Sequence, residues 1–266
     1  EVSNFIQTTD AIAASARWHG KANVLSQSHR TWDIIENAAE ASEHQGFAFP
    51  PHFICNIHKL HCNIEPTVPD DVLAGKMIRQ RRSAVDMDGH TSISLNQFIE
   101  MLARTVPALT PVPWDSFPYP TSVHLTIFVH RVVGLPKGMY LLVRDTSSLD
   151  KLKKNLVHKE VQFLWETPQN IPENFPLYCL HKQDVTSVAT LISCEQEIAG
   201  NGCFSLGMIA DFEDSIEKYG PAHYRKLFWE TGMVGQVLYL EAEAHGVRAT
   251  GIGCFFDDEM HHVFGI

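Results

Sequence analysis

A strand–turn–strand pattern near the middle of the chain constrains its fold more than any other feature. Four apolar residues alternate with their neighbours along the first strand: Val123, Leu125, Ile127 and Val129. This period of two is typical of a strand with at least one buried face. A turn over residues 134–138 follows, and residues 139–144 form a second strand. The two segments predict a hairpin whose loop is longer than the two-residue type.

Two amphipathic helices flank this hairpin in the sequence. The first is capped by Ser94, with Gln97 at the third helical position in a capping-box pattern. Its apolar face consists of Leu95, Phe98, Ile99, Leu102 and Val106. The second helix spans residues 225–245, and Gly246 suits the left-handed position after its end. Its expected buried stripe consists of Met233, Val237, Leu240 and Ala244. We therefore expect an α+β fold, with a mostly antiparallel central sheet flanked by long helices.

The rest of the second half carries weaker patterns. Residues 148–156 predict a short helix, and residues 185–193 and 203–210 look like a strand and a second buried segment. Residues 247–256 predict a buried strand or turn punctuated by glycines. A last short helix starts at Asp257 and is ended by a glycine.

The chain of 266 residues is long enough for one large domain or two small ones. Residues 1–70 are irregular in pattern, and we expect them to form an N-terminal extension or arm. Residues 71–266 show the regular patterns and no long linker, so they are expected to form one domain.

The charge balance limits the partners. The chain has 21 basic and 31 acidic residues, a formal net charge of −10, which argues against nucleic acid and anionic membranes. No stretch approaches the ~18–20 apolar residues that span a bilayer, and no signal peptide is visible. We therefore expect a cytoplasmic protein with no membrane partner, whose six cysteines are reduced thiols.

One basic segment stands out in this acidic chain. Lys76, Arg79, Arg81 and Arg82 lie within seven positions, and Ser83 follows them. Arginine forks match phosphate oxygens, and a serine hydroxyl adds a donor. A solvated basic face paired with nearby acids explains the same pattern about equally well.

A second segment is rich in glycine. Gly251 and Gly253 are separated by one residue, and Cys254 follows. Closely spaced glycines let the backbone approach a flat ligand or a phosphate. The pattern alone is weak, because a dinucleotide fingerprint needs a third glycine that opens a helix.

A third segment pairs Lys218 with Tyr219 ahead of Gly220. A lysine whose pKa is lowered by burial can act as a general base, and an adjacent phenol can relay the proton. On spacing alone, an ordinary surface turn before a helix is the better interpretation.

A fourth cluster contains zinc-type ligands at short spacing: Cys55, His58, His61 and Cys62. Structural zinc sites usually combine one close pair with a distant second pair. We therefore expect no metal site here. Neither a serine-hydrolase elbow nor a zinc-protease motif is present.

Taken together, the segments resemble the FMN-dependent nitroreductase superfamily, and most closely its SagB-type dehydrogenase branch, which includes azoline oxidases. The resemblance runs from about residue 70 to the end and rests on five motifs in order. They are the basic segment at residues 78–83, the helix at residues 94–106, the hairpin at residues 118–140, the Lys218–Gly220 segment with Tyr224 and Arg225, and residues 230–266.

The resemblance implies roles for particular residues. Arg81, Arg82 and Ser83 would hold the phosphate and ribityl side of FMN, and the backbone around Gly253 and Cys254 would lie against its ring. Lys218 and Tyr219 match the pair with which azoline oxidases remove a ring proton while hydride passes to flavin. The resemblance also implies a homodimer, or a pairing with a second nitroreductase-like domain, with flavin bound between the two.

Three residues depart from the family pattern. Val85 stands where a further basic residue is usual, Trp114 where a small residue is usual, and Asp115 adds a negative charge near the expected anion. Three functions therefore remain open. They are an FMN-dependent oxidase of an azoline-like small molecule or modified peptide, an NAD(P)H-dependent nitro or quinone reductase, and a non-catalytic domain that has lost FMN. The Lys218 and Tyr219 pair favours the first over the second, because a nitroreductase needs no substrate base, whereas Val85, Trp114 and Asp115 favour the third.

Overall fold

The computed structural model describes residues 11–43, 60–69, 71–117 and 119–266. Its centre is a four-stranded sheet with the order β5-β4-β2-β6, in which every neighbouring pair is antiparallel. The strands are β2 (Val123–Val129), β4 (Gly138–Leu142), β5 (Leu177–His181) and β6 (Phe204–Ala210). The predicted hairpin is confirmed, because β2 pairs with β4. All seven residues of β2 are buried, so both of its faces are covered.

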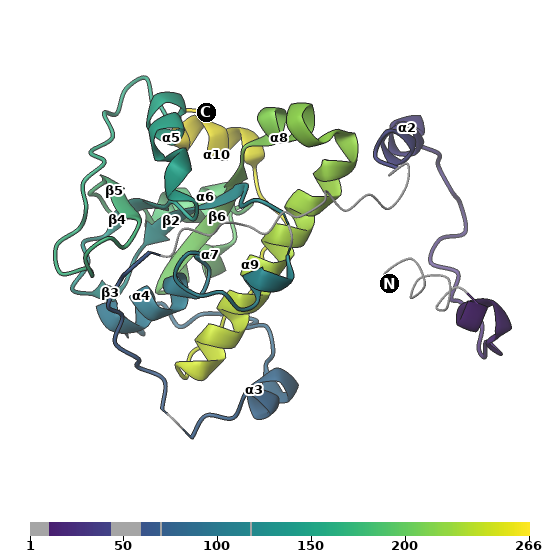
Figure 1. The fold of residues 1–266 in the computed structure, drawn as a ribbon, viewed down its shortest axis with the longest axis horizontal. Helices are drawn as coiled ribbons and strands as arrows, with labels where there is room; N and C mark the ends of the chain where they lie inside the picture. The colour runs from purple at the N-terminus through teal and green to yellow at the C-terminus, as the bar shows by residue number, and fades with distance from the viewer. Residues whose placement is uncertain (1–10, 44–59, 70, 118) are drawn as a thin grey trace.

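Most of the helices and short elements pack around this sheet, whereas α2 (Asp33–Ala41) lies apart from it (Figure 1). The other helices are α3 (Ala74–Gln80), α4 (Leu95–Ala103), α5 (Leu149–Asn155), α6 (Thr186–Ile192), α7 (Glu197–Asn201), α8 (Phe212–Tyr219), α9 (Tyr224–Ala244) and α10 (Asp257–Phe264). A two-residue parallel pair joins β1 (Ile93–Ser94) to β3 (Val132–Val133). Short 3-10 helices are η1 (Trp114–Ser116), η2 (Thr146–Ser148) and η3 (Pro221–His223).

The alternation along β2 divides the core into two layers of side chains. Leu125 and Ile127 share one cluster with Phe98 of α4 and Val234 of α9. Phe128, which points to the other face, belongs to a second cluster. That cluster includes Leu152, Ile192 and Phe264, from α5, α6 and α10. The sheet is therefore sandwiched between two helical layers, which confirms the expected α+β fold.

Helix boundaries follow the local chemistry of the sequence. The Ser94 side chain accepts a hydrogen bond from the Gln97 backbone, and the Gln97 side chain accepts one from the Ser94 backbone, which completes the capping box. Gly246 follows α9 with φ 73°, and Gly265 ends α10 with φ 65°. At Gly265 a Cβ atom would lie 2.4 Å from the Val157 backbone, so only glycine fits this helix end.

Some expectations from the sequence are wrong. The segment at residues 185–193 holds helix α6 instead of a strand, and β5 was not anticipated. Residues 247–256 form neither helix nor strand, and they are exposed or half-buried. The expected stripe on α9 is only half-buried, and the helix buries a neighbouring stripe instead: Leu227, Glu230, Val234 and Ala242. The reason lies in Glu230, which turns inward to pair with the buried Arg144.

Residues 60–69 lie against the domain, although they precede its expected start. The Leu60 backbone N–H donates to the Ala108 carbonyl at 3.0 Å, and Cys62 and Ile64 pack on the core. Of the possible zinc ligands, Cys55 and His58 lie outside the described residues. None of the helices in the described part of the chain has the length and hydrophobicity that crossing a bilayer requires.

Candidate functional site

The basic segment leaves helix α3 where the helix ends. Arg81 is the C-cap residue, and its backbone N–H donates to the Met77 carbonyl at 2.8 Å. The Arg82 guanidinium folds back over this end and donates to the carbonyls of Arg79 and Arg81, at 3.0 and 2.7 Å. Arg82 therefore satisfies free carbonyls of the helix terminus, a usual place for a cation. Arg81 is half-buried, whereas Arg82 and Ser83 are exposed.

Tyr239 of α9 joins the basic segment to the glycine segment. The Arg81 guanidinium lies over the Tyr239 ring, 4.7 Å from its centroid. The Tyr239 hydroxyl forms a hydrogen bond with the Ser83 hydroxyl at 3.0 Å and accepts one from the Gly251 backbone N–H at 2.6 Å. The two segments that the sequence assigned to one ligand thus meet at a single side chain.

The electrostatics at Tyr239 follow from these contacts. Burial alone would raise the pKa of its hydroxyl, but the net direction is downward. Hydrogen bonds with Ser83, Gly251 and Thr250, together with the charge of Arg81, stabilise the phenolate and lower the pKa. Sequence reasoning assigned no role to Tyr239, because an aromatic residue on an apolar helix is an ordinary core residue.

The glycine segment presents its backbone to solvent. Gly253 and Cys254 are exposed, and a Cβ atom on Gly253 would have no neighbour within 4 Å. An open pocket of about 420 Å³ lies beside this segment, lined by Ala84, Val85, Gln196, Glu197, Ile198, Thr250, Gly251 and Ile252. The pocket therefore borders both predicted segments and reaches the start of α7.

The expectation of reduced thiols is wrong for one pair of cysteines. Cys194 and Cys254 form a disulfide, with their Cα atoms 5.9 Å apart. This separation lies within the usual range for a disulfide, but the two residues are 60 positions apart in the chain. The Gln196 side chain also donates to the Cys254 carbonyl at 3.3 Å. Both contacts fasten the glycine segment to the turn before α7.

Lys218 and Tyr219 lie at the C-terminal end of α8. The Lys218 ammonium is 5.1 Å from the centroid of the Tyr219 ring, and the Tyr219 ring is 4.7 Å from the ring of His223. His223 is buried, and burial together with the charge of Lys226 lowers its pKa. Lys218 itself is exposed, so this single chain does not supply the burial that would turn a lysine into a base.

The three departures from the family pattern occupy different environments. Trp114 is a core residue, whose indole N–H donates to the Arg104 carbonyl at 2.9 Å and whose ring lies under Arg144. Asp115 is exposed, and Val85 is exposed at the edge of the pocket. The large side chain of Trp114 therefore packs within the core.

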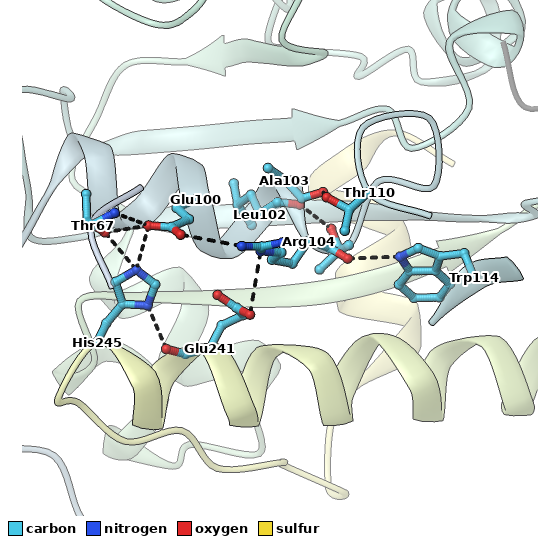
Figure 2. A network of polar contacts seen from close by, with 10 residues as sticks. Thr67, Glu100, Leu102, Ala103, Arg104, Thr110, Trp114, Glu241 and His245 are labelled. Carbon is cyan, nitrogen blue, oxygen red and sulfur yellow. Dashed lines mark hydrogen bonds and ion pairs between the residues drawn. The ribbon is translucent and has the colours of Figure 1, made fainter. Parts of the chain in front are cut away.

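A second polar network ties the C-terminal end of α9 to the segment that leads into α3 (Figure 2). The Glu100 carboxylate accepts hydrogen bonds from the backbone and hydroxyl of Thr67, both at 2.6 Å, and lies 3.3 Å from His245 Nε2. Arg104 bridges Glu100 and Glu241, at 3.7 and 3.9 Å. Sequence reasoning missed this network, because Glu100 lies 33 residues from Thr67 and 145 from His245.

Comparisons with known proteins bear on the fold. The chain is 26% identical over 155 residues to a provisionally named nitroreductase of Methanocaldococcus jannaschii. It also superposes with a TM-score of 0.55 on the crystal structure of a nitroreductase, also provisionally named, from Anabaena variabilis, at 20% identity and over 73% of this chain. The fold is nitroreductase-like.

The extent of these likenesses is limited. The chain covers 63% of the length of the Methanocaldococcus relative and 35% of the Anabaena protein. No protein-family model matches the chain. The comparisons therefore show a nitroreductase-like fold and a partial sequence similarity to a protein named as a nitroreductase.

Proposed function

We propose that this chain is an FMN-dependent oxidoreductase domain. The observation that carries the proposal is the meeting of the Arg81–Ser83 and Gly251–Cys254 segments at Tyr239, within a nitroreductase-like fold. The two segments do not belong to the same helix or strand, and Ser83 lies 156 residues from Tyr239 in the sequence. A shared ligand explains why such distant segments bring a guanidinium, a hydroxyl and an open backbone to one place.

The chemistry of the residues fits FMN. The half-buried Arg81 guanidinium and the exposed Ser83 hydroxyl suit a phosphate dianion. The backbone at Gly253 has open space in front of it and can lie against a flat ring. FMN, when bound, supplies the capacity to accept or give up a hydride. In this proposal the N–H groups at Gly253 and Cys254 stabilise negative charge at the edge of the ring.

We further propose that the complete site needs a second copy of the chain or a second nitroreductase-like domain. Lys218 and Tyr219 lie near the N-terminal end of α9, whereas α3 lies near the other end (Figure 1). About 22 Å of helix separates Tyr224 from Tyr239, at about 1.5 Å per residue. One chain therefore does not bring the proposed base to its own Arg81, but an antiparallel partner along α9 could do so.

For the reaction, we propose oxidation of an azoline-like small molecule or modified peptide, with Lys218 removing a proton and Tyr219 relaying it. Their packing against one another and beside His223 supports a joint role. A nitro or quinone reductase, which requires no substrate base, is the second candidate. It is favoured by the exposure of Lys218 and by the description of the Methanocaldococcus relative.

A visible absorption spectrum with and without added FMN tests the cofactor. We expect about one flavin per wild-type chain. Arg81→Ala should bind FMN at least about tenfold more weakly. Arg79→Ala is the matched control, since it removes the same charge from the same basic segment. A colourless protein that does not bind FMN would instead support a non-catalytic domain of this fold. Equal retention in both variants would contradict the role of Arg81.

The reaction is tested by single turnover of the flavin-loaded protein. If the substrate base is real, Lys218→Ala keeps flavin and loses oxidation of an azoline, whereas the exposed control Lys154→Ala keeps both. If NAD(P)H reduces the flavin equally in wild type and Lys218→Ala and no azoline reacts, the reductase is the correct function.

The expected cytoplasmic location also remains a proposal, and the Cys194–Cys254 disulfide argues against a strongly reducing compartment.

A further inference from the structure

We infer that Tyr239 is a positioning residue. It holds the basic segment and the glycine segment at fixed positions relative to each other, on the phosphate side of the proposed cofactor site. The inference rests on the proposed FMN site, but it concerns a residue that no sequence motif assigned to it. Tyr239 contacts Arg81 with its ring, and Ser83 and Gly251 with its hydroxyl.

Little else fixes these two segments to each other. Residues 81–85 lie between α3 and β1, and residues 246–256 lie between α9 and α10, so neither segment is part of a helix or strand. One backbone hydrogen bond, from Ala84 to Ala249 at 3.0 Å, joins them directly. Tyr239 stands on α9, the longest helix described, and therefore connects both segments to a rigid element. Loss of its hydroxyl would free the Gly251 N–H and the Ser83 hydroxyl together.

Counting donors and acceptors explains how the hydroxyl can serve an anion. The Gly251 N–H can only donate, so the Tyr239 oxygen must accept there. The Tyr239 O–H then remains to be donated, and Ser83 Oγ is 3.0 Å away. If Tyr239 donates to Ser83, the Ser83 proton is free to be donated to a phosphate oxygen. The ring meanwhile contacts the Arg81 guanidinium, which lies 4.7 Å from the ring centroid.

The test compares FMN with riboflavin, which lacks the phosphate. We expect Tyr239→Phe to weaken FMN binding about tenfold, as one lost hydrogen bond to a charged ligand network would. Riboflavin binding should weaken much less, because Ser83 and Arg81 act on the phosphate and only the freed Gly251 N–H belongs to the segment that faces the ring. Tyr239→Leu, which also removes the ring under Arg81, should weaken FMN binding further. Tyr178→Phe on β5 is the control for removal of a phenol elsewhere.

Two more measurements separate positioning from general destabilisation. In a double-mutant cycle, Ser83→Ala with Tyr239→Phe should cost less than the sum of the two single losses, because part of the effect of Tyr239 passes through Ser83. Equal losses for FMN and riboflavin, or additive losses in the cycle, would overturn the inference.

Hydrogen exchange distinguishes failure of this inference from failure of the proposed function. If the wild type binds neither flavin, the cofactor proposal fails, but the positioning role remains measurable without ligand. We expect Tyr239→Phe to speed amide exchange in residues 81–84 and 249–252 and to leave α4 unchanged, whereas Tyr178→Phe should change neither. Unchanged exchange in both segments would show that Tyr239 does not hold them.

Discussion

Two arginines in this protein lie over aromatic rings with almost the same geometry, yet their surroundings differ completely. The Arg144 guanidinium lies 4.6 Å from the Trp114 centroid, and the Arg81 guanidinium lies 4.7 Å from the Tyr239 centroid. Arg144 is 1% exposed, whereas Arg81 is half-buried. The comparison teaches that burial and counter-charge, and not the arginine–aromatic pair, decide between a structural and a binding role.

The partners of the two arginines make this difference concrete. Arg144 donates to the Thr105 carbonyl at 2.6 Å and to the Val123 carbonyl at 2.9 Å, and forms an ion pair with Glu230. In the part of the chain that the structure describes, Arg81 pairs with no carboxylate. Glu230 thus compensates the charge of Arg144 inside the protein, whereas the charge of Arg81 is not compensated by a described carboxylate, as the proposed phosphate site requires.

The largest expected effect comes from unpairing Arg144. Burial raises the pKa of Glu230, and Arg144 opposes that shift, so the two charges depend on each other. Glu230→Ala would leave a buried guanidinium without its counter-charge, and we expect the free energy of unfolding to fall by about 3–5 kcal/mol. Urea denaturation measures this. The exposed control Glu217→Ala should change stability little, and a similar small change in Glu230→Ala would refute the structural role of the pair.

A second prediction concerns acid, through His124 beside Arg144. Burial, followed by the charge of Arg144, lowers the pKa of His124 from 6.5 to about 4, and its Nδ1 accepts the Arg144 backbone N–H at 3.2 Å. The unfolded chain binds the proton first, so stability is full above about pH 6.5 and is lost as the pH falls toward 4. The full loss amounts to about 3 kcal/mol, at 1.36 kcal/mol for each pKa unit.

Urea unfolding between pH 4.5 and 7 checks this pH dependence. Burial also lowers the pKa of His130 to about 4 and lowers that of His223, so we expect the wild type to show the combined slope of these histidines and His124→Gln a shallower one. A variant with the slope of the wild type would show that His124 does not drive the loss.

The elements that the sequence predicted well are those whose signals are local. The capping box at Ser94 and Gln97, the alternation along β2 and the glycine after α10 each need only a few neighbouring residues. Helix α6 was mistaken for a strand because its seven residues are rich in β-branched and apolar side chains. The buried stripe of α9 was misplaced because Glu230 turns inward only in the presence of Arg144, which is 86 residues away.

A third prediction tests what holds the binding region together. The disulfide closes a long loop and fastens the exposed glycine segment, so Cys254→Ser should lower the free energy of unfolding by about 2 kcal/mol under oxidising conditions. Dithiothreitol should bring the wild type to the stability of the variant and leave the variant unchanged. If the reductant has no effect on the wild type, the bond contributes nothing to stability.

The candidate site was predictable only in its parts. Arg81, Ser83 and Gly253 were found from local patterns and a family resemblance, but the side chain that joins their segments was not. Tyr239 gains its role from contacts with residues far away in the chain, and the Cys194–Cys254 bond likewise depends on the folded arrangement. Such contacts produce no periodic pattern in the sequence, because each one joins a single residue of one segment to a single residue of another.

The smallest expected effect on stability completes the comparison of the two arginines. Arg81→Ala removes one ring contact and a half-buried charge that pairs with no described carboxylate, so the free energy of unfolding should change by less than about 0.5 kcal/mol. Arg144→Ala, which leaves Glu230 buried and unpaired, should cost several times more. Both are measured by urea denaturation without FMN. With saturating FMN, the wild type should gain stability by mass action and Arg81→Ala should gain less, since ligand binding stabilises only the folded state that retains affinity. If Arg81→Ala destabilised the ligand-free protein as strongly as Arg144→Ala does, Arg81 would be a second structural arginine, and its placement over Tyr239 would serve the fold and not a ligand.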